Sequence, residues 1–410
     1  MALKLPRTVV VLGLVSFFND LASEIVVPLI PILLAGVLAA GPIALGLIEG
    51  VADAVASFIK LWSGRRSDVL GGRRKGLTLA GYALSNAARP LLGLAGSWGA
   101  VLCLRSIDRV GKGLRTAPRD ALVSDATPEP LRGYAYGFQR ALDNAGAVGG
   151  SLLAAAVLAW SAVSLPQMIL LSAVPGFLAV LCLAVGVRTT PALRDTPPCQ
   201  GGEVTPTPAA PPLLDKAGNV VPPLAWMSLD ASLRRYLTVF ALFTLARASE
   251  TFILLLGHER GAPTVELLLL WSTLSFCKAV TSTLGGRLSD RFGRSALIVA
   301  SWSAFALSFA LFGAARTPLA LWLVTVLYGL LTGAGEGAER ALVADFARPA
   351  QRGTAFGWYN LVAGLAAIPA GLLFGTLWQY AGAAVAFTTA AALAAAAALL
   401  LWAQRSTLST

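Results

Sequence analysis

The sequence predicts an all-α integral membrane protein with about twelve transmembrane helices, arranged as two pseudo-symmetric six-helix bundles. Of its 410 residues, 56% are hydrophobic and 13% are charged, and the mean hydropathy is +0.71. A water-soluble domain of this size does not expose so much apolar surface, so we expect a lipid bilayer as its main solvent. Apolar stretches long enough to cross a bilayer recur along the chain. Two short motifs also occur twice at nearly the same separation, which divides the chain into similar halves.

Charged residues, glycine and proline separate the apolar stretches and set the boundaries of the predicted spans. In the first half, the predicted spans are 8–38, 43–63, 76–96, 98–122, 133–160 and 164–187. In the second half, they are 235–257, 264–286, 294–315, 318–343, 353–377 and 382–403. The first span is a retained helix rather than a signal peptide, because it is long and contains Asn19, Asp20 and Glu24.

The predicted domains are an N-terminal six-helix bundle at 1–187 and a C-terminal six-helix bundle at 233–410. The segment 188–232 between them contains TPPCQGGEVTPTPAAPPLLDKAGNVVPP, which is rich in Pro, Gly and Thr. Such a composition cannot bury enough apolar surface to fold alone, so we expect a cytoplasmic linker that acts as a tether.

Positive charge predicts the orientation of the chain in the membrane. The turn after the second span, GRRSDVLGGRRK, is strongly basic, whereas the turn at Ala39–Pro42 carries no charge. Basic turns stay in the cytoplasm, so we expect a multi-pass protein of the inner (cytoplasmic) membrane with both termini cytoplasmic. The same turns explain much of the net charge of +11 without nucleic acid as a partner.

The internal repeat is visible in two motifs. Gly64-Arg-Arg-Ser-Asp68-Val-Leu-Gly71 matches Gly286-Arg-Leu-Ser-Asp290-Arg-Phe-Gly293, with the aspartates 222 positions apart. Asp125, which ends Ala-Leu-Val-Ser-Asp, matches Asp345, which ends Ala-Leu-Val-Ala-Asp, with a separation of 220 positions. Because two independent motifs share nearly one offset, the halves are repeats of one unit.

A G-x-x-S-D-x-x-G-R-R signature after the second and eighth of about twelve spans, with a long central linker, resembles the major facilitator superfamily. The resemblance covers essentially the whole chain. It implies that the motif's aspartate accepts hydrogen bonds at the N-terminal end of a helix from the opposite half, which latches the cytoplasmic side in the outward-open state. A carboxylate at a helix N-terminus is stabilised by the helix dipole, enough to bias such an equilibrium. The latch residues carried over by position are Gly64, Asp68, Gly71, Arg73 and Arg74, with Asp290, Gly293 and Arg294 as the second copy.

Charged residues inside the predicted spans are the candidate functional residues, because a charge near the bilayer centre must face protein, water or a ligand. Asp20 and Glu24 are four residues apart in the first span, so they share one helix face, and Glu49 and Asp53 do the same in the second. The fourth span has a largely cationic stripe at three- and four-residue spacing. Its members are Arg105, Asp108, Lys112, Arg115 and Arg119.

These charges divide into two predicted groups. The proton-coupling and substrate group consists of Asp20, Glu24, Glu49, Asp53, Arg105 and Lys112. The gating group, which joins the latch residues, consists of Arg115, Arg119, Asp125, Asp143, Glu336, Glu339 and Asp345. The second half is plainer, with Arg247, Glu250 and Lys278 among its main buried charges, so we expect the coupling chemistry in the first half.

Asp20 and Glu24 are the predicted coupling site, because their depth and spacing on a Pro-containing helix direct both carboxyls toward a central cavity. A carboxyl group buried beside a like charge tends to keep its proton, and could therefore exchange it as the cavity opens to each side. His258 is the one histidine of the chain and falls in a predicted turn, so any titration that drives transport must use carboxylates.

These observations favour a secondary active transporter that moves a small organic solute by alternating access, coupled to protons as a symporter or antiporter. The buried Arg and Lys of the first half favour an anionic or zwitterionic solute. One alternative is a divalent metal-ion transporter of the iron type, since carboxylates are hard oxygen ligands. A second is a non-transporting sensor on the same fold. We expect no enzyme activity, because no Ser/His or Cys/His arrangement and no phosphate-binding loop is present. We also expect a monomer with no cofactor and no resident metal.

Overall fold

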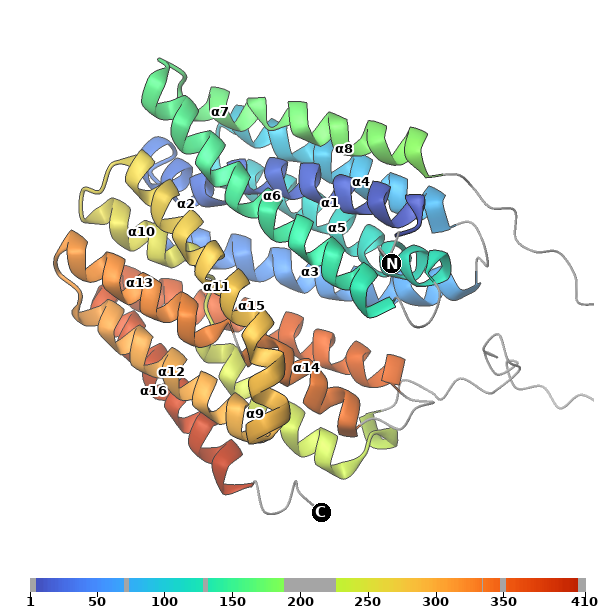
Figure 1. The fold of residues 1–410 in the computed structure, drawn as a ribbon. Coiled ribbons are helices and arrows are strands. Elements are labelled where there is room, and N and C mark those ends of the chain that lie inside the picture. The colour runs from blue at the N-terminus through green and yellow to red at the C-terminus, as the bar shows by residue number, and fades with distance from the viewer. Residues whose placement is uncertain are drawn as a thin grey trace, which may run out of the picture.

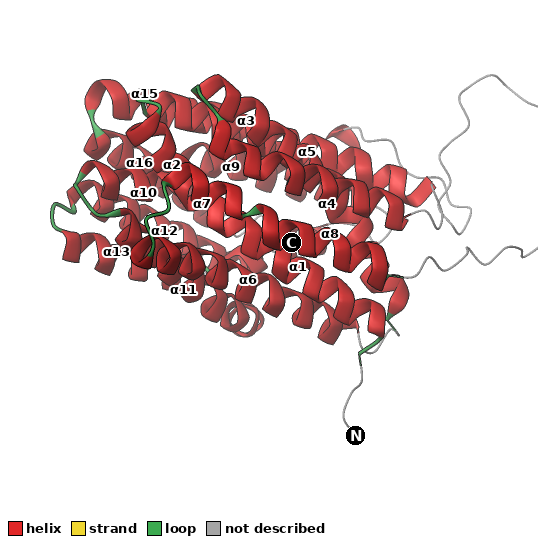
Figure 2. Ribbon diagram, turned by 90° about the horizontal axis from the view of Figure 1, so that it is seen from above, coloured by secondary structure: helices red, strands yellow, loops and turns green. Residues whose placement is uncertain are grey.

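The computed structural model describes residues 5–69, 74–127, 132–187, 226–333, 335–346 and 352–404. Within these ranges the chain forms helices joined by short turns and contains no strand (Figure 2). The first half, blue to green in Figure 1, lies beside the second half, yellow to red. The all-helical membrane fold predicted from the sequence is confirmed.

The first half begins with a broken span, because Pro28 and Pro31 each remove a backbone donor from the helix. A short 3-10 turn and a π-helical turn follow the break, at Val27–Leu29 and Leu33–Val37. The helical elements of this half are α1 (Arg7–Val26), η1 (Val27–Leu29), α2 (Ile30–Ile32), η2 (Leu33–Val37), α3 (Pro42–Val69), α4 (Arg74–Leu91), η3 (Leu92–Leu94), α5 (Trp98–Ala126), α6 (Arg132–Trp160), α7 (Leu165–Leu171) and α8 (Ala173–Gly186).

The second half has two broken spans, with interruptions after Ala246 and after Thr332. Its helical elements are η5 (Trp226–Ser228), α9 (Ala231–Ala246), α10 (Thr251–Glu259), α11 (Thr264–Phe292), α12 (Arg294–Ala314), α13 (Pro318–Thr332), α14 (Gly335–Phe346), α15 (Arg352–Ala381) and α16 (Ala383–Ala403).

The elements, joined across their breaks, coincide with the predicted spans to within a few residues at most boundaries. In the described ranges, nine helical segments are long and apolar enough to cross a membrane. The remaining segments are more polar or shorter; α5, for example, carries the charged stripe of the fourth predicted span. The arrangement is consistent with about twelve transmembrane helices.

Two helices are longer than predicted at their charged ends. The helix α3 continues to Val69, so Gly64 and Asp68 lie in its last turns rather than in a loop. The helix α11 likewise continues to Phe292 and contains Asp290. Charged residues do not end a helix, and the next glycine after each aspartate comes three residues later in the sequence, at Gly71 and Gly293. The helix α9 begins at Ala231, two residues before the predicted domain boundary.

We call the end of the bundle where α3 ends and α4 begins the basic end, and the opposite end the distal end. The halves meet along α3 and α15 and along α6 and α11. Glycines bring α3 and α15 into backbone contact: a Cβ on Gly46 would lie 2.0 Å from the carbonyl oxygen of Gly371, and a Cβ on Gly371 would lie 2.1 Å from that of Gly46. Nothing larger than glycine fits at this contact, which lies in the distal half of both helices.

Glycines also set the packing of α1 against α6 within the first half. A Cβ on Gly146 would lie 2.4 Å from the carbonyl oxygen of Phe17, and one on Gly150 would lie 2.4 Å from that of Leu21. Small residues of this kind let membrane helices approach closely.

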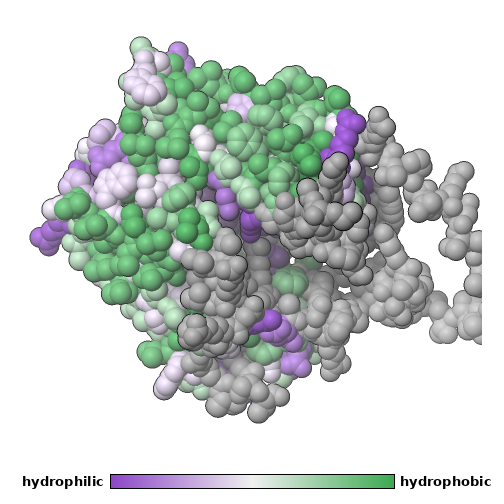
Figure 3. Space-filling model, viewed as in Figure 1, coloured by the Kyte–Doolittle hydropathy of each residue, from purple (hydrophilic) through white to green (hydrophobic). Residues whose placement is uncertain are grey.

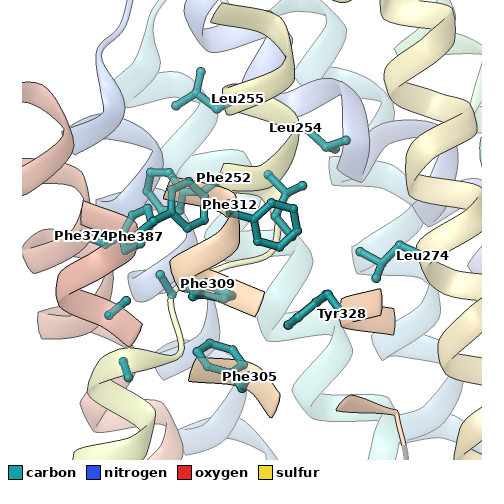
Figure 4. Packing of buried hydrophobic residues seen from close by; sticks show 14 of the residues in the cluster. Phe252, Leu254, Leu255, Leu274, Phe305, Phe309, Phe312, Tyr328, Phe374 and Phe387 are labelled. Atoms are coloured by element: carbon teal, nitrogen blue, oxygen red, sulfur yellow. The ribbon is translucent and has the colours of Figure 1, made fainter. Parts of the chain in front are cut away.

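Aromatic side chains fill the core of the second half (Figure 4). The ring centroids of Phe309 and Phe387 are 5.3 Å apart, and those of Phe374 and Phe387 are 5.1 Å apart. Tyr328 belongs to the same cluster, 5.9 Å from Phe305. On the face shown in Figure 3, apolar residues cover most of the described surface, as lipid contact requires, and charged residues lie at the ends and along the boundary between the halves.

Candidate functional site

A cavity of about 450 Å³ lies between the two halves. The helices α3 and α5 line it from the first half, and α9, α10, α11 and α15 line it from the second. Its lining runs from Val27 and Gly371 toward Lys60 and Tyr359, on the basic side of the glycine contact. Six basic and three acidic side chains line it: Lys60, Arg105, Arg109, Lys112, Arg247, Lys278, Glu49, Asp53 and Glu250.

A buried ion-pair network supports the first-half wall. Glu49 accepts hydrogen bonds from Arg105 at 3.3 and 3.4 Å and lies 3.9 Å from Arg109. Asp108, behind the wall, pairs with Arg89 at 2.9 Å and with Arg105 at 3.3 Å. All of these side chains are at least 87% buried. The charge of Asp108 is therefore paired with two arginines of its own half.

Asp53 and Lys112 face the cavity in front of this network. Asp53 is exposed and Lys112 is half-buried, and neither forms an ion pair with another residue in the described part of the chain. They are close enough to interact electrostatically with each other, and the positive charges of Arg109 and Lys60 also act on Lys112. The first-half wall therefore presents positive charge that the protein itself does not fully pair.

The second-half wall is built on the break between α9 and α10. Arg247 and Glu250 lie at the two ends of this break. Glu250 forms an ion pair with Lys278 and accepts a hydrogen bond of 2.7 Å from the hydroxyl of Tyr328. Because the ring of Tyr328 is held in the aromatic core, the position of the Glu250 carboxylate is fixed by the packing of the second half.

Glu339, predicted as a gating residue, lies behind this second wall. It is buried and accepts hydrogen bonds of 2.8 Å from both Trp302 and Tyr359. Its carboxylate is also 3.9 Å from the guanidinium of Arg247. These three contacts of Glu339 are all with residues of the second half.

Asp20 and Glu24 are not among the residues that line the cavity, in contrast to the orientation expected from the sequence. Asp20 accepts a hydrogen bond of 2.9 Å from Asn19 on its own helix. Glu24 accepts one of 2.7 Å from the indole nitrogen of Trp271. Trp271 itself lines the cavity, so Glu24 contacts a lining residue of the opposite half without being one.

The other predicted gating residues lie at several places within each half. Arg119 pairs with Asp120 at 3.0 Å and with Asp143 at 4.0 Å, and Arg115 lies 4.6 Å over the ring of Tyr82. In the second half, Arg294 forms an ion pair with Asp345. Each of these contacts joins residues of the same half.

The latch motif is described only in part. Arg74 is buried at the start of α4, and Gly293 precedes α12 with a φ of 83°, which favours glycine. Gly71 and Arg73 lie outside the described residues. The backbone is described, but the side-chain surroundings are not, for Gly64, Asp68, Asp125, Asp290 and Glu336.

The four acids of the first two spans do not converge as the metal-ion hypothesis requires. Glu49 is engaged by two arginines, and Glu24 by a tryptophan of the other half. Among the residues that the structure describes, no three His, Cys, Asp or Glu side chains come together as metal ligands. Buried arginines and an indole therefore engage two of the four carboxylates, those of Glu49 and Glu24.

Sequence reasoning placed Glu49, Asp53, Arg105 and Lys112 in the site, and all four line the cavity. It did not assign a site role to five further lining residues, Lys60, Arg109, Arg247, Glu250 and Lys278. The sequence does mark these residues, because each is a charged residue within or beside an apolar stretch. Weighing such charges equally in both halves would have found the three of the second half, Arg247, Glu250 and Lys278.

Comparison with known proteins agrees with this architecture. The family model of the Major Facilitator Superfamily matches residues 12–272 and 236–408. An MFS-type transporter of Methanocaldococcus jannaschii is 30% identical over 385 residues, covering 92% of this chain and 89% of the relative.

Solved structures share the fold over nearly the whole chain. A POT family transporter in complex with 5-aminolevulinic acid has a TM-score of 0.78 at 12% identity, covering 100% of this chain and 98% of that one. The human organic anion transporter MFSD10 has a TM-score of 0.64 at 21% identity, covering 96% and 99%. The family match shows that this chain belongs to the major facilitator superfamily.

Proposed function

We propose that this protein is a secondary active transporter that binds a small organic anion in the central cavity and moves it across the membrane by alternating access. The observation that carries the proposal is the charge of the cavity. Six basic side chains line it against three acidic ones, and Lys112 has no acidic partner within the described part of the chain. A positively charged cavity in a low-dielectric environment attracts anions and repels cations.

The position of the cavity supports alternating access. Backbone contact between Gly46 and Gly371 closes the distal half of the interface, while the cavity lies on the basic side of this contact. In the proposed orientation, the basic end is cytoplasmic, as the distribution of Lys and Arg favours. The conformation then corresponds to a state closed toward the outside. Rocking of the halves about the cavity would expose the same residues to the other side.

We assign proton coupling to two half-buried carboxylates of the first half, Asp20 and Glu24. Both lie on α1 beside the cationic helix α5, and Lys112 acts electrostatically on both. An anion bound near Lys112 would change the electrostatic environment of these carboxylates and favour their protonation. Proton uptake and anion binding would thereby support each other.

The test is binding and uptake of organic anions by the purified protein. Carboxylates and organic phosphates, with cationic and neutral analogues of similar size, are compared for thermal stabilisation and for uptake into proteoliposomes at constant ionic strength. We expect anions to stabilise the protein and to be accumulated under a proton gradient. Stabilisation by cations or divalent metals, with no effect of any anion, would contradict the proposal.

Two lysine variants make the test specific to the site. Lys112→Gln removes a cavity charge, and loss of a charge-assisted contact predicts binding weakened by roughly tenfold to a hundredfold. Lys75→Gln is the matched control, because Lys75 lies at the start of α4 and donates to the backbone of Ala184 at 2.9 Å, away from the cavity. Equal weakening in both variants would show a general effect of surface charge.

A further inference from the structure

Two side-chain hydrogen bonds join the halves in the distal part of the interface, and both come from adjacent residues of α11. The indole nitrogen of Trp271 donates to the carboxylate of Glu24 on α1 at 2.7 Å. The hydroxyls of Ser272 and Ser151, on α11 and α6, are 2.6 Å apart. One turn of α11 therefore contacts two helices of the opposite half.

The packing of α1 and α6 directs Glu24 toward this turn. A Cβ on Gly150 would lie 2.4 Å from the carbonyl oxygen of Leu21 and 3.1 Å from the Cβ of Glu24, so the backbone of α6 packs directly against α1 beside Glu24. The charged groups that act on Glu24 are Asp20 on its own helix and Arg105 and Lys112 on α5. Trp271 is the group that faces it from the second half.

The indole N–H can only donate, so the strength of this link depends on the charge of its acceptor. A hydrogen bond to an ionised carboxylate is roughly twice as strong as one to a neutral carboxyl group. The indole therefore favours the ionised form of Glu24 in the closed distal interface, whereas burial of the carboxyl group favours its neutral form. By linkage, protonation of Glu24 weakens this hydrogen bond between the halves, and loss of the hydrogen bond favours protonation.

We propose that Trp271 is a positioning residue that couples the protonation of Glu24 to the opening of the distal end. This proposal rests on the alternating-access function proposed above and names the residue of the second half through which the proton acts. It also gives Glu24 a coupling role that does not require it to line the cavity. Ser272 holds the same turn of α11 against α6 but carries no titratable group.

The experiment measures the distance between the halves at the distal end as a function of pH. Spin labels are attached to cysteines at Val37 and Leu319, which are exposed residues at the distal end of the first and second half, in a background without native cysteines. Trp271→Phe removes the donor and keeps an aromatic ring. Trp322→Phe is the matched control, since Trp322 donates to Glu266 at 2.8 Å within the second half.

In the otherwise native background, lowering the pH is expected to reduce the closed population. Replacing an ionic by a neutral acceptor predicts a change of about five- to tenfold in the ratio of closed to open molecules. Trp271→Phe should lower the closed population at high pH and abolish this pH dependence, whereas Trp322→Phe should keep it. A pH dependence retained in Trp271→Phe, or lost equally in both variants, would overturn the proposal.

Glu24→Gln provides a second measurement if the tryptophan variant does not fold. It keeps an acceptor for the indole but cannot ionise, so its distance distribution should not change over the pH values at which the native sequence responds. A response equal to that of the native sequence would also overturn the proposal. Because the distances are measured without substrate, this result is separate from the anion-binding test, whose failure would instead contradict the proposed function.

Discussion

Loss of the Asp108 charge is expected to be among the most destabilising single changes in the first half. Asp108 is the shared partner of Arg89 and Arg105, at 2.9 and 3.3 Å. The side chains of the two arginines are 2% and 1% exposed, and that of Asp108 is 4% exposed. Water therefore cannot replace the carboxylate when it is removed.

The magnitude follows from the burial of the charges. Breaking a buried ion pair by removing one partner typically costs about 3–5 kcal/mol, because the remaining charge is uncompensated. Arg105 keeps Glu49 as a partner, so the larger part of the loss arises at Arg89. We expect Asp108→Asn to lower the free energy of unfolding by about 3–5 kcal/mol. The assay is denaturant unfolding in one detergent, followed by the fluorescence of the ten tryptophans.

Asp120→Asn is the control for this prediction. Asp120 pairs with Arg119 at 3.0 Å, but its side chain is 44% exposed, so its loss should change the free energy of unfolding by at most about 1 kcal/mol. The double variant Arg89→Leu with Asp108→Leu removes both charges and should cost less than Asp108→Asn alone. A small loss for Asp108→Asn, equal to that of the control, would refute the argument from burial.

The remaining predictions concern the equilibrium between conformations. Gly371→Ala places a Cβ 2.1 Å from the carbonyl oxygen of Gly46 and should lower the population closed at the distal end, whereas Gly76→Ala, with no atom within 4 Å, should not. Distances between spin labels on the two halves report both variants, and an unchanged distribution in Gly371→Ala would contradict the role of the glycine contact. Asp68→Asn removes the charge of the predicted latch and should favour states open at the basic end. Distances between spin labels on the two halves check this prediction as well. An unchanged distance distribution would refute the latch but not the fold.

The fold was predictable because the bilayer imposes a simple rule on the sequence. Apolar length gave most helix boundaries, and the repeated aspartate motifs gave the two halves. Breaks within spans could be predicted from the sequence only where a proline marks them, as at Pro28. The interruption between α9 and α10 has no proline or glycine between Arg247 and Glu250, so no local signal marks it.

The site was only partly predictable because the identity of a buried charge does not specify its partner. Glu49 and Glu24 have the same side chain and similar depth in neighbouring spans. The first is engaged by Arg105 and lines the cavity, whereas the second contacts Trp271 of the other half. This difference depends on how α1 and α11 approach each other, which is a tertiary property. Helical spacing places residues on one face but does not say what lies opposite that face.

The meeting of α3 and α15 through Gly46 and Gly371 has a consequence for how sharply the protein can switch. A backbone surface has no rotamers to order, so this seam forms without loss of side-chain entropy. Its attraction is mainly dispersion, which declines steeply when atoms separate by less than 1 Å. A seam with these properties favours full closure or full separation over intermediate gaps. In the proposed alternating-access cycle, such a seam would limit leakage, because partly open states, through which water and ions could pass uncoupled, would be sparsely populated.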